Sequence, residues 1–128
     1  LNLPGVKAGY HNLTHHGGRE ENIRQIFTID SNYMNSWAGF VQSLKNTKTA
    51  TGTLYDETIL LFGSGMGDAN KHSNHHLPVI LSGGLFKHRG LVDFKDKPLC
   101  DLYVTMLQKF GLKLDQFGTS KGNFNEIA

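Results

Sequence analysis

Apolar residues in the first half of the chain recur at the three- and four-residue spacings of an amphipathic helix. The pattern starts near Glu20 and Glu21, where acidic side chains suit the helix dipole, and ends in a polar loop at 45–52. Asp30 falls on the apolar stripe, so we expect it at the stripe's edge or paired with a cation. The apolar positions are Ile23, Ile26, Phe27, Met34, Trp37, Phe40, Val41 and Leu44.

Two short, continuous apolar runs follow, and each ends at glycine. Residues 58–62 precede Gly63, and residues 77–81 precede a serine and two further glycines. Such runs are typical of strands buried on both faces, as in a parallel sheet covered by helices. A second amphipathic pattern at 99–110 predicts a helix that Gly111 ends.

This order of elements predicts an α/β protein with helices packed on a small, mostly parallel sheet. A short third strand near Leu91 and Val92 would still leave that sheet thin. We therefore expect residues 1–128 to be one domain that forms the C-terminal part of a larger one. The remaining strands would come from upstream in a parent chain or from another subunit of a homo-oligomer.

The composition is that of an ordinary globular protein, with 38% hydrophobic and 19% charged residues. The basic residues are scattered and the net charge is +2, which argues against a nucleic-acid partner. No apolar stretch is long enough to span a membrane. Cys100 is the single cysteine, and its place in the second helical pattern favours a buried, inert thiol.

Histidine is the unusual residue, with seven copies in the chain. A neutral imidazole carries a lone pair suited to Zn, Fe, Mn or Ni, so clustered histidines are candidate metal ligands. The alternative is a solvated loop surface rich in glycine and asparagine. Two clusters contain six of the histidines: His11, His15 and His16, and then His72, His75 and His76.

Position in the predicted fold strengthens the metal interpretation of both clusters. If the first cluster is helical, His11 and His15 lie one turn apart on one face, a recurrent metal-binding spacing, and His16 points elsewhere. The second cluster follows Asp68 and Asn70 in the loop between the two predicted strands. Ligands bind in such loops at the carboxyl ends of parallel strands.

A serine nucleophile is a weaker alternative. Ser64 stands between two glycines after a predicted strand, but the G-x-S-x-G frame of a nucleophile elbow is absent. The glycines also lack the lysine of a phosphate-binding P-loop. Turning of the backbone explains them better.

Three segments of the sequence, the first histidine cluster among them, resemble a known family. His11-Asn12-Leu13-Thr14-His15-His16 resembles the H-x-x-S/T-H-H signature of a bacterial family, usually exported, that is named for this motif. Residues 58–84 and 107–118 also resemble that family, so the similarity covers nearly the whole chain and matches the C-terminal portion of its members. The resemblance implies a periplasmic or secreted protein.

The family is in turn similar to the alkaline-phosphatase and sulfatase superfamily of metal-dependent ester hydrolases. There a histidine stands a few residues before the Val-Pro that opens the next strand, and His72 has that spacing before Leu77-Pro78-Val79. A D-x-x-x-H element supplies two more ligands, a part that His11 and His15 can take. The resemblance thus implies these metal ligands: His11, His15, His72, Asp68 and His76. It implies these residues for orienting the ligands or contacting substrate: His16, His75 and Asn70.

One departure leaves two functions open. The superfamily usually has Asp-His or Asp-Asn after its first strand, where this chain has Ser64-Gly65-Met66. The nucleophile is expected far upstream, outside this chain. The chain is then part of a hydrolase of a small anionic or sugar-linked ester, with Zn as the expected metal and Mn, Fe or Ni as alternatives. Otherwise it is a non-catalytic module that holds a metal or a sugar, or a metal-free structural domain.

Overall fold

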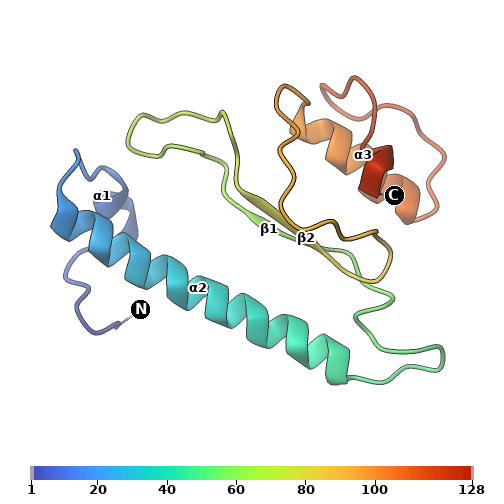
Figure 1. The fold of residues 1–128 in the computed structure, drawn as a ribbon, viewed down its shortest axis with the longest axis horizontal. Coiled ribbons are helices and arrows are strands. Elements are labelled where there is room, and N and C mark those ends of the chain that lie inside the picture. The colour runs from blue at the N-terminus through green and yellow to red at the C-terminus, as the bar shows by residue number, and fades with distance from the viewer. Residues whose placement is uncertain (1, 128) are drawn as a thin grey trace. The chain divides into compact units, whose positions relative to one another are not determined.

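The helix predicted from the apolar pattern is the longest element. In the computed structural model, which describes residues 2–127, α2 extends over Glu20–Asn46 (Figure 1). Glu20 and Glu21 occupy its first turn and Lys45 its last, as the helix dipole favours. The predicted helix and its polar end are therefore confirmed.

The apolar stripe of α2 stays largely exposed. The helix buries Gln25, Ile29 and Leu44, whereas Phe27 is 74% exposed and Phe40 50%. Periodicity therefore identified the helix but not which of its side chains are buried in this chain.

A short helix, α1 (Tyr10–Thr14), packs on α2. Its Leu13 is only 1% exposed and is the best-buried apolar side chain of this region. The Tyr10 hydroxyl donates a hydrogen bond to Oδ1 of Asp30 at 3.0 Å, so the partner expected for Asp30 is a tyrosine and not a cation. Tyr10 is only partly buried, with 41% of its surface exposed, and this partial burial, with the hydrogen bond and charge of Asp30, raises the pKa of Tyr10 to about 12.

The two predicted strands are present, but the expectation of a parallel sheet was wrong. β1 (Leu60–Gly63) and β2 (Val79–Ser82) form a two-stranded antiparallel sheet. Parallel strands need a crossover connection, commonly a helix. Residues 64–78 contain no helix and turn back on themselves, so the chain returns antiparallel. The third strand expected near Leu91 and Val92 is also absent from the described chain, and Leu91 is fully exposed.

The second predicted helix is α3 (Leu99–Lys109), and it ends as expected at Gly111. Gly111 has a φ of 86°, and its amide donates to the carbonyl of Gln108 at 2.9 Å. The next amide, that of Leu112, donates to the carbonyl of Leu107 at 3.1 Å. This pair of bonds is the Schellman motif. On α3, Cys100 is half-buried, whereas the sequence predicted a buried thiol.

Two buried polar side chains of α3 hold the C-terminal tail. Asp101 is 4% exposed, and its Oδ1 accepts hydrogen bonds from the amides of Lys121 at 2.7 Å and Gly122 at 3.2 Å. Thr105 is 1% exposed, and its hydroxyl accepts a bond from the amide of Phe124 at 2.7 Å. The tail ends in a short 3-10 helix, η1 (Asn125–Ile127).

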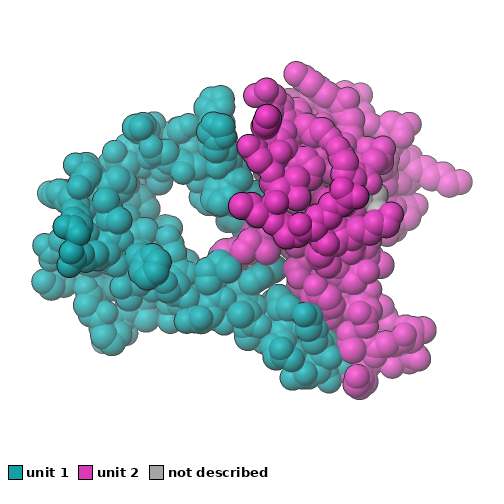
Figure 2. Space-filling model, in the orientation of Figure 1, with its two compact units in different colours: residues 1–47, 63–79 teal, residues 48–62, 80–128 magenta. Residues whose placement is uncertain are grey.

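The contacts divide the chain into two compact units, coloured separately in Figure 2. Unit 1 comprises α1, α2 and the loop 63–79, and unit 2 comprises residues 48–62 and those from 80 onward. Both histidine clusters lie in unit 1, so the candidate site can be described within one unit.

Candidate metal centre

Three histidine rings from the two clusters lie in a row. His11 is on α1, His15 directly follows that helix, and His72 comes from the loop 63–79. The ring centres of His11 and His15 are 5.0 Å apart, and those of His15 and His72 are 4.9 Å apart. Neighbouring rings meet edge to face, with interplanar angles of 81° and 75°. The fold therefore brings together residues that are far apart in sequence.

Helix α1 positions the first two rings. The segment is helical as expected, but only as far as Thr14, whose hydroxyl donates to the carbonyl of His11 at 2.8 Å. His15 is the C-cap residue, with φ −86° and ψ 50°. The two imidazoles remain neighbours, and His15 adjoins the ring that comes from the loop.

A tight turn at residues 67–73 presents the third ring. The amide of Ser73 donates to the carbonyl of Asp68 at 2.9 Å, and the amide of Gly67 donates to the carbonyl of Ser73 at 2.9 Å. His72 adopts a left-handed conformation with a φ of 54°, which is uncommon for a residue with a side chain. Position 67 requires glycine, because a Cβ there would collide with the carbonyl oxygen of His75.

The carboxylate of Asp68 is engaged within this turn. Its Oδ1 accepts a hydrogen bond from the amide of Lys71 at 3.2 Å, and its Oδ2 lies 3.5 Å from the Lys71 ammonium. Burial opposes ionisation of Asp68, but these interactions with Lys71 outweigh it and hold the pKa of Asp68 below its usual value. The geometry therefore gives Asp68 a role in shaping the turn.

Asn70 joins the turn to the segment after α1. Its Oδ1 accepts a hydrogen bond from the amide of Gly17 at 3.0 Å. This contact and the His15–His72 contact both connect the end of α1 with the turn 67–73. Asn70 thus connects the two segments that carry His15 and His72.

The remaining sequence candidates lie outside the row of rings. Nδ1 of His16 accepts a hydrogen bond from the amide of Gly18 at 3.0 Å, which closes the turn before α2. His75 and His76 are exposed, and His76 has a left-handed φ of 54°. Among the described residues, no contact joins the side chains of His75 or His76 to the three rings.

The decisive distance is between His15 and His72, whose Nε2 atoms are 3.5 Å apart. An N–H···N hydrogen bond is usually nearer to about 3 Å, and 3.5 Å is long for one. Two imidazole nitrogens bound to one tetrahedral ion at about 2.0–2.1 Å stand roughly 3.4 Å apart. Within residues 2–127, however, no group of three or more His, Cys, Asp or Glu side chains is arranged to hold a metal. The spacing therefore fits a metal held by two nitrogen ligands, those of His15 and His72.

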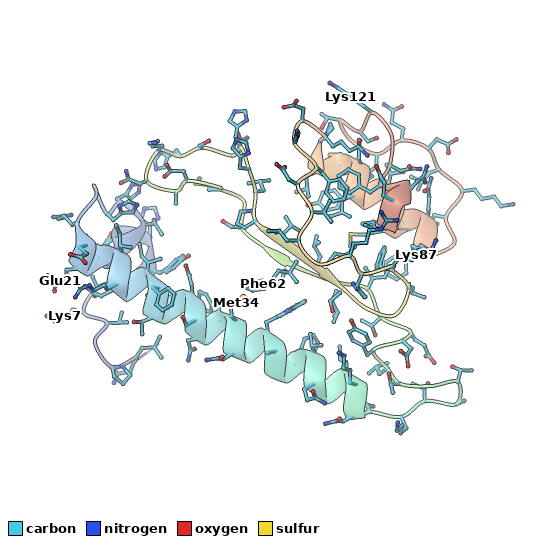
Figure 3. The ribbon with its side chains drawn as sticks, in the orientation of Figure 1. Lys7, Glu21, Met34, Phe62, Lys87 and Lys121 are labelled. Atoms are coloured by element: carbon cyan, nitrogen blue, oxygen red, sulfur yellow. The ribbon has the colours of Figure 1, made fainter. Side chains whose placement is uncertain are left out.

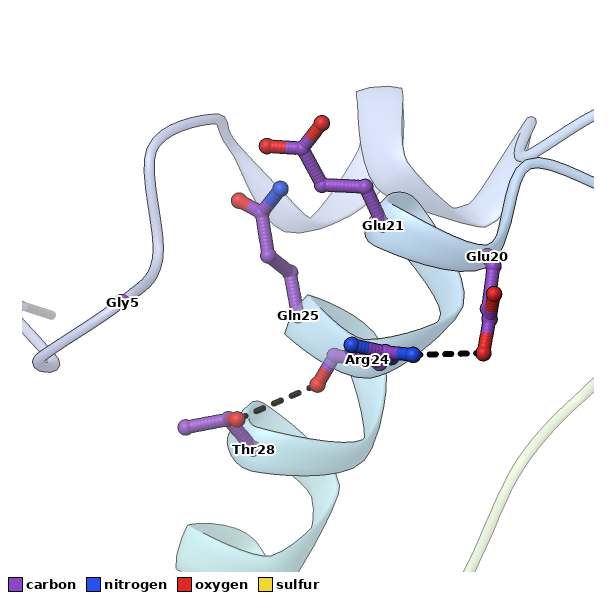
Figure 4. Close-up of a pocket in the computed structure, with 6 residues that line it drawn as sticks. All are labelled: Gly5, Glu20, Glu21, Arg24, Gln25 and Thr28. Carbon is purple, nitrogen blue, oxygen red and sulfur yellow. Dashed lines mark hydrogen bonds and ion pairs between the residues drawn. The ribbon is translucent and has the colours of Figure 1, made fainter.

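A separate groove of about 360 Å³ lies beside the first turns of α2 (Figure 4). Arg24 and Glu20 on its wall form an ion pair at 2.6 Å. Lys7 and Glu21, both labelled in Figure 3, pair at 3.3 Å, and the Lys7 amide donates to the Gln25 side chain at 2.7 Å. No histidine lines this groove, and each of its charged side chains is in an ion pair, so the row of rings remains the candidate centre.

The residues that shape the turn do not stand out in the sequence. Lys71 and Gly17 belong to neither histidine cluster and to no motif. An aspartate followed within three residues by a turn-favouring asparagine is a local turn signal, and it was available at Asp68. Ser64 also has a turn role, since its hydroxyl accepts a hydrogen bond from the amide of Met66 at 3.1 Å.

Comparison with known proteins gives the chain no relative: no protein-family model, no curated protein and no solved structure matches it. None of the described helices is both long and apolar enough to cross a membrane.

Proposed function

We propose that this chain binds a divalent transition-metal ion through the imidazoles of His15 and His72. The observation that carries the proposal is the 3.5 Å separation of their Nε2 atoms, because residues 57 positions apart meet there at the spacing of a shared ion. His11 is the candidate for a third ligand, since its ring neighbours that of His15. Zn²⁺ is the expected metal because neutral imidazoles suit it, and Mn, Fe and Ni are the alternatives.

Such a site would be open and positively charged. Neutral imidazoles do not cancel the charge of a divalent ion, and two or three of them leave coordination positions free. An oxygen of a small anionic ester can fill a free position. The ion would then polarise the ester and stabilise negative charge that develops on it.

Hydrolysis of phosphate or sulfate esters is the enzymatic form of this proposal. The resemblance to the alkaline-phosphatase and sulfatase superfamily supports it, and the same resemblance implies that these residues are part of a larger domain of an exported protein. Hydrolysis also needs a nucleophile, which the resemblance places upstream of these residues. A metal-binding module without catalysis is the second candidate, and Ser64-Gly65-Met66, where the superfamily usually has Asp-His or Asp-Asn, favours it.

Metal content tests the proposal. The chain is purified without a histidine tag, reconstituted with Zn²⁺, and analysed by inductively coupled plasma mass spectrometry. We expect near-stoichiometric zinc, which His15→Ala and His72→Asn each remove. Asparagine is chosen because it tolerates the left-handed backbone at position 72. His75→Ala is the matched control and keeps the zinc. Zinc that persists in both His15→Ala and His72→Asn contradicts the proposal, as does a chain that takes up no metal.

A further inference from the structure

The two halves of the proposed site come from separate segments. His15 belongs to the end of α1, which packs on α2 and buries Leu13. His72 belongs to the turn 67–73, within a loop that has no helix or strand of its own between Ser64 and Pro78. The first half therefore rests on packed helices, while the second depends on a turn.

The turn keeps its own shape. The paired backbone of Asp68 and Ser73 closes it, and the side chain of Asp68 bonds to both the amide and the ammonium of Lys71. These bonds close the turn around His72, whose backbone is left-handed. None of them involves α1, so the turn can keep this conformation when it is not docked.

By contrast, the contacts that dock the turn are exposed. Among the described residues, the polar and ring contacts of this kind are the Gly17–Asn70 hydrogen bond at 3.0 Å and the approach of the His15 and His72 rings. Water competes for exposed hydrogen bonds, so their net contribution to stability is small. A ligand that binds only when His15 and His72 are together would add its binding free energy to the docked state.

We propose that the metal ion acts as a clasp that holds the loop 63–79 against the end of α1. The clasp rests on the proposed metal site and adds a conformational consequence to it. With free metal at one hundred times its dissociation constant, the ratio of docked to undocked loop rises about a hundredfold. Occupancy of the site is then coupled to the order of the loop that carries His72.

Limited proteolysis with trypsin reads out the clasp. A protease needs several residues in extended form, so cleavage after Lys71 reports undocking and opening of the turn. Lys48 lies outside the loop, in unit 2, and is the internal control. We expect Zn²⁺ to slow cleavage after Lys71 at least tenfold and to leave cleavage after Lys48 unchanged. Removal of zinc with a chelator restores the faster rate.

The variants separate the clasp from the site. In His72→Asn, cleavage after Lys71 should be fast with or without Zn²⁺, while the circular dichroism of the helices stays that of the parent chain. His15→Ala should behave in the same way and serves as a second variant, altered on the other segment. Hydrogen exchange of residues 64–78, followed by mass spectrometry, should show the same dependence on zinc and on both histidines.

Zinc binding is measured on the same samples by calorimetry, so that two failures can be told apart. Binding with unchanged cleavage after Lys71 overturns the clasp and leaves the proposed site standing. Absence of zinc binding overturns both. Protection that survives in both His15→Ala and His72→Asn also overturns the clasp, because it would then come from other contacts.

Discussion

The loop 63–79 and the C-terminal tail are both irregular segments that lie against a helix, but they are held in opposite ways. The tail bonds to Asp101 and Thr105, whose side chains are 4% and 1% exposed. The turn within the loop meets α1 through exposed groups. Buried polar groups are costly to leave unpaired, so they fix a segment without help. Exposed polar groups can bond to water instead and do not fix a segment. A bound ion therefore stabilises the docked turn more than it could stabilise the tail.

The largest loss of stability should come from a change in α1, the helix on which the loop docks. Leu13→Ala removes the buried side chain of α1 and is expected to cost about 2–5 kcal/mol of stability, because a cavity replaces packed atoms. Denaturation in urea measures the loss. The matched control is Phe27→Ala on the exposed stripe of α2, which should change stability by less than about 0.5 kcal/mol. Equal losses would show that the burial described for α1 is wrong.

The tail provides the next largest effect. Asp101→Ala leaves the amides of Lys121 and Gly122 without their acceptor and should cost about 2–3 kcal/mol, with faster hydrogen exchange in the tail. Asp101→Asn keeps an acceptor oxygen, so its loss should be smaller. Should Asp101→Ala leave the exchange of the tail unchanged, the contrast between tail and loop would disappear.

A smaller effect distinguishes two roles for Asp68. If it shapes the turn, Asp68→Ala should weaken zinc binding about tenfold, as the loss of a residue that orients a ligand does. Asp68→Asn keeps the oxygen that accepts from the Lys71 amide and should retain most of the affinity. A metal-ligand role predicts a different result, in which both variants lose the metal alike. Calorimetric titration of the three chains decides between these roles.

How much the sequence can reveal depends on how local the signal is. The helices α2 and α3 and the stop at Gly111 were predicted correctly because periodicity, dipole preference and glycine conformation act within a few residues. Strand direction was predicted wrongly because it depends on the turn 67–73, whose hydrogen bonds depend on how Asp68 folds back on Lys71.

The candidate site was likewise predictable only in part from the sequence. Spacing placed His11 and His15 together, and the resemblance added His72; the structure brings these three rings into a row. His76 stands outside the row although its φ equals that of His72, because it lies beyond the turn 67–73 that presents His72, and residue spacing does not reveal where that turn closes. Exposure of Phe27 was likewise beyond reach, since periodicity identifies a stripe but not what covers it.

The smallest effect concerns Tyr10, the first residue of α1. Its pKa is raised to about 12 in the folded chain, so its contribution to stability is complete below the ordinary value of about 10 and is lost as pH rises through about 12. Absorbance of the phenolate during alkaline titration should show this late ionisation, and Tyr10→Phe identifies which step it is. Asp30→Asn should move the step to lower pH, because a negative charge and its hydrogen bond are removed. A step that does not move would contradict the Tyr10–Asp30 contact.

The sharing of one ion by His15 and His72 is tested most directly by X-ray absorption at the zinc edge. The zinc-loaded chain should show nitrogen ligands at about 2.0–2.1 Å with the multiple scattering of two or three imidazoles. His72→Asn at high zinc should lose one imidazole from that count. A spectrum with no imidazole scattering, or one that His72→Asn leaves unchanged, would contradict the shared site.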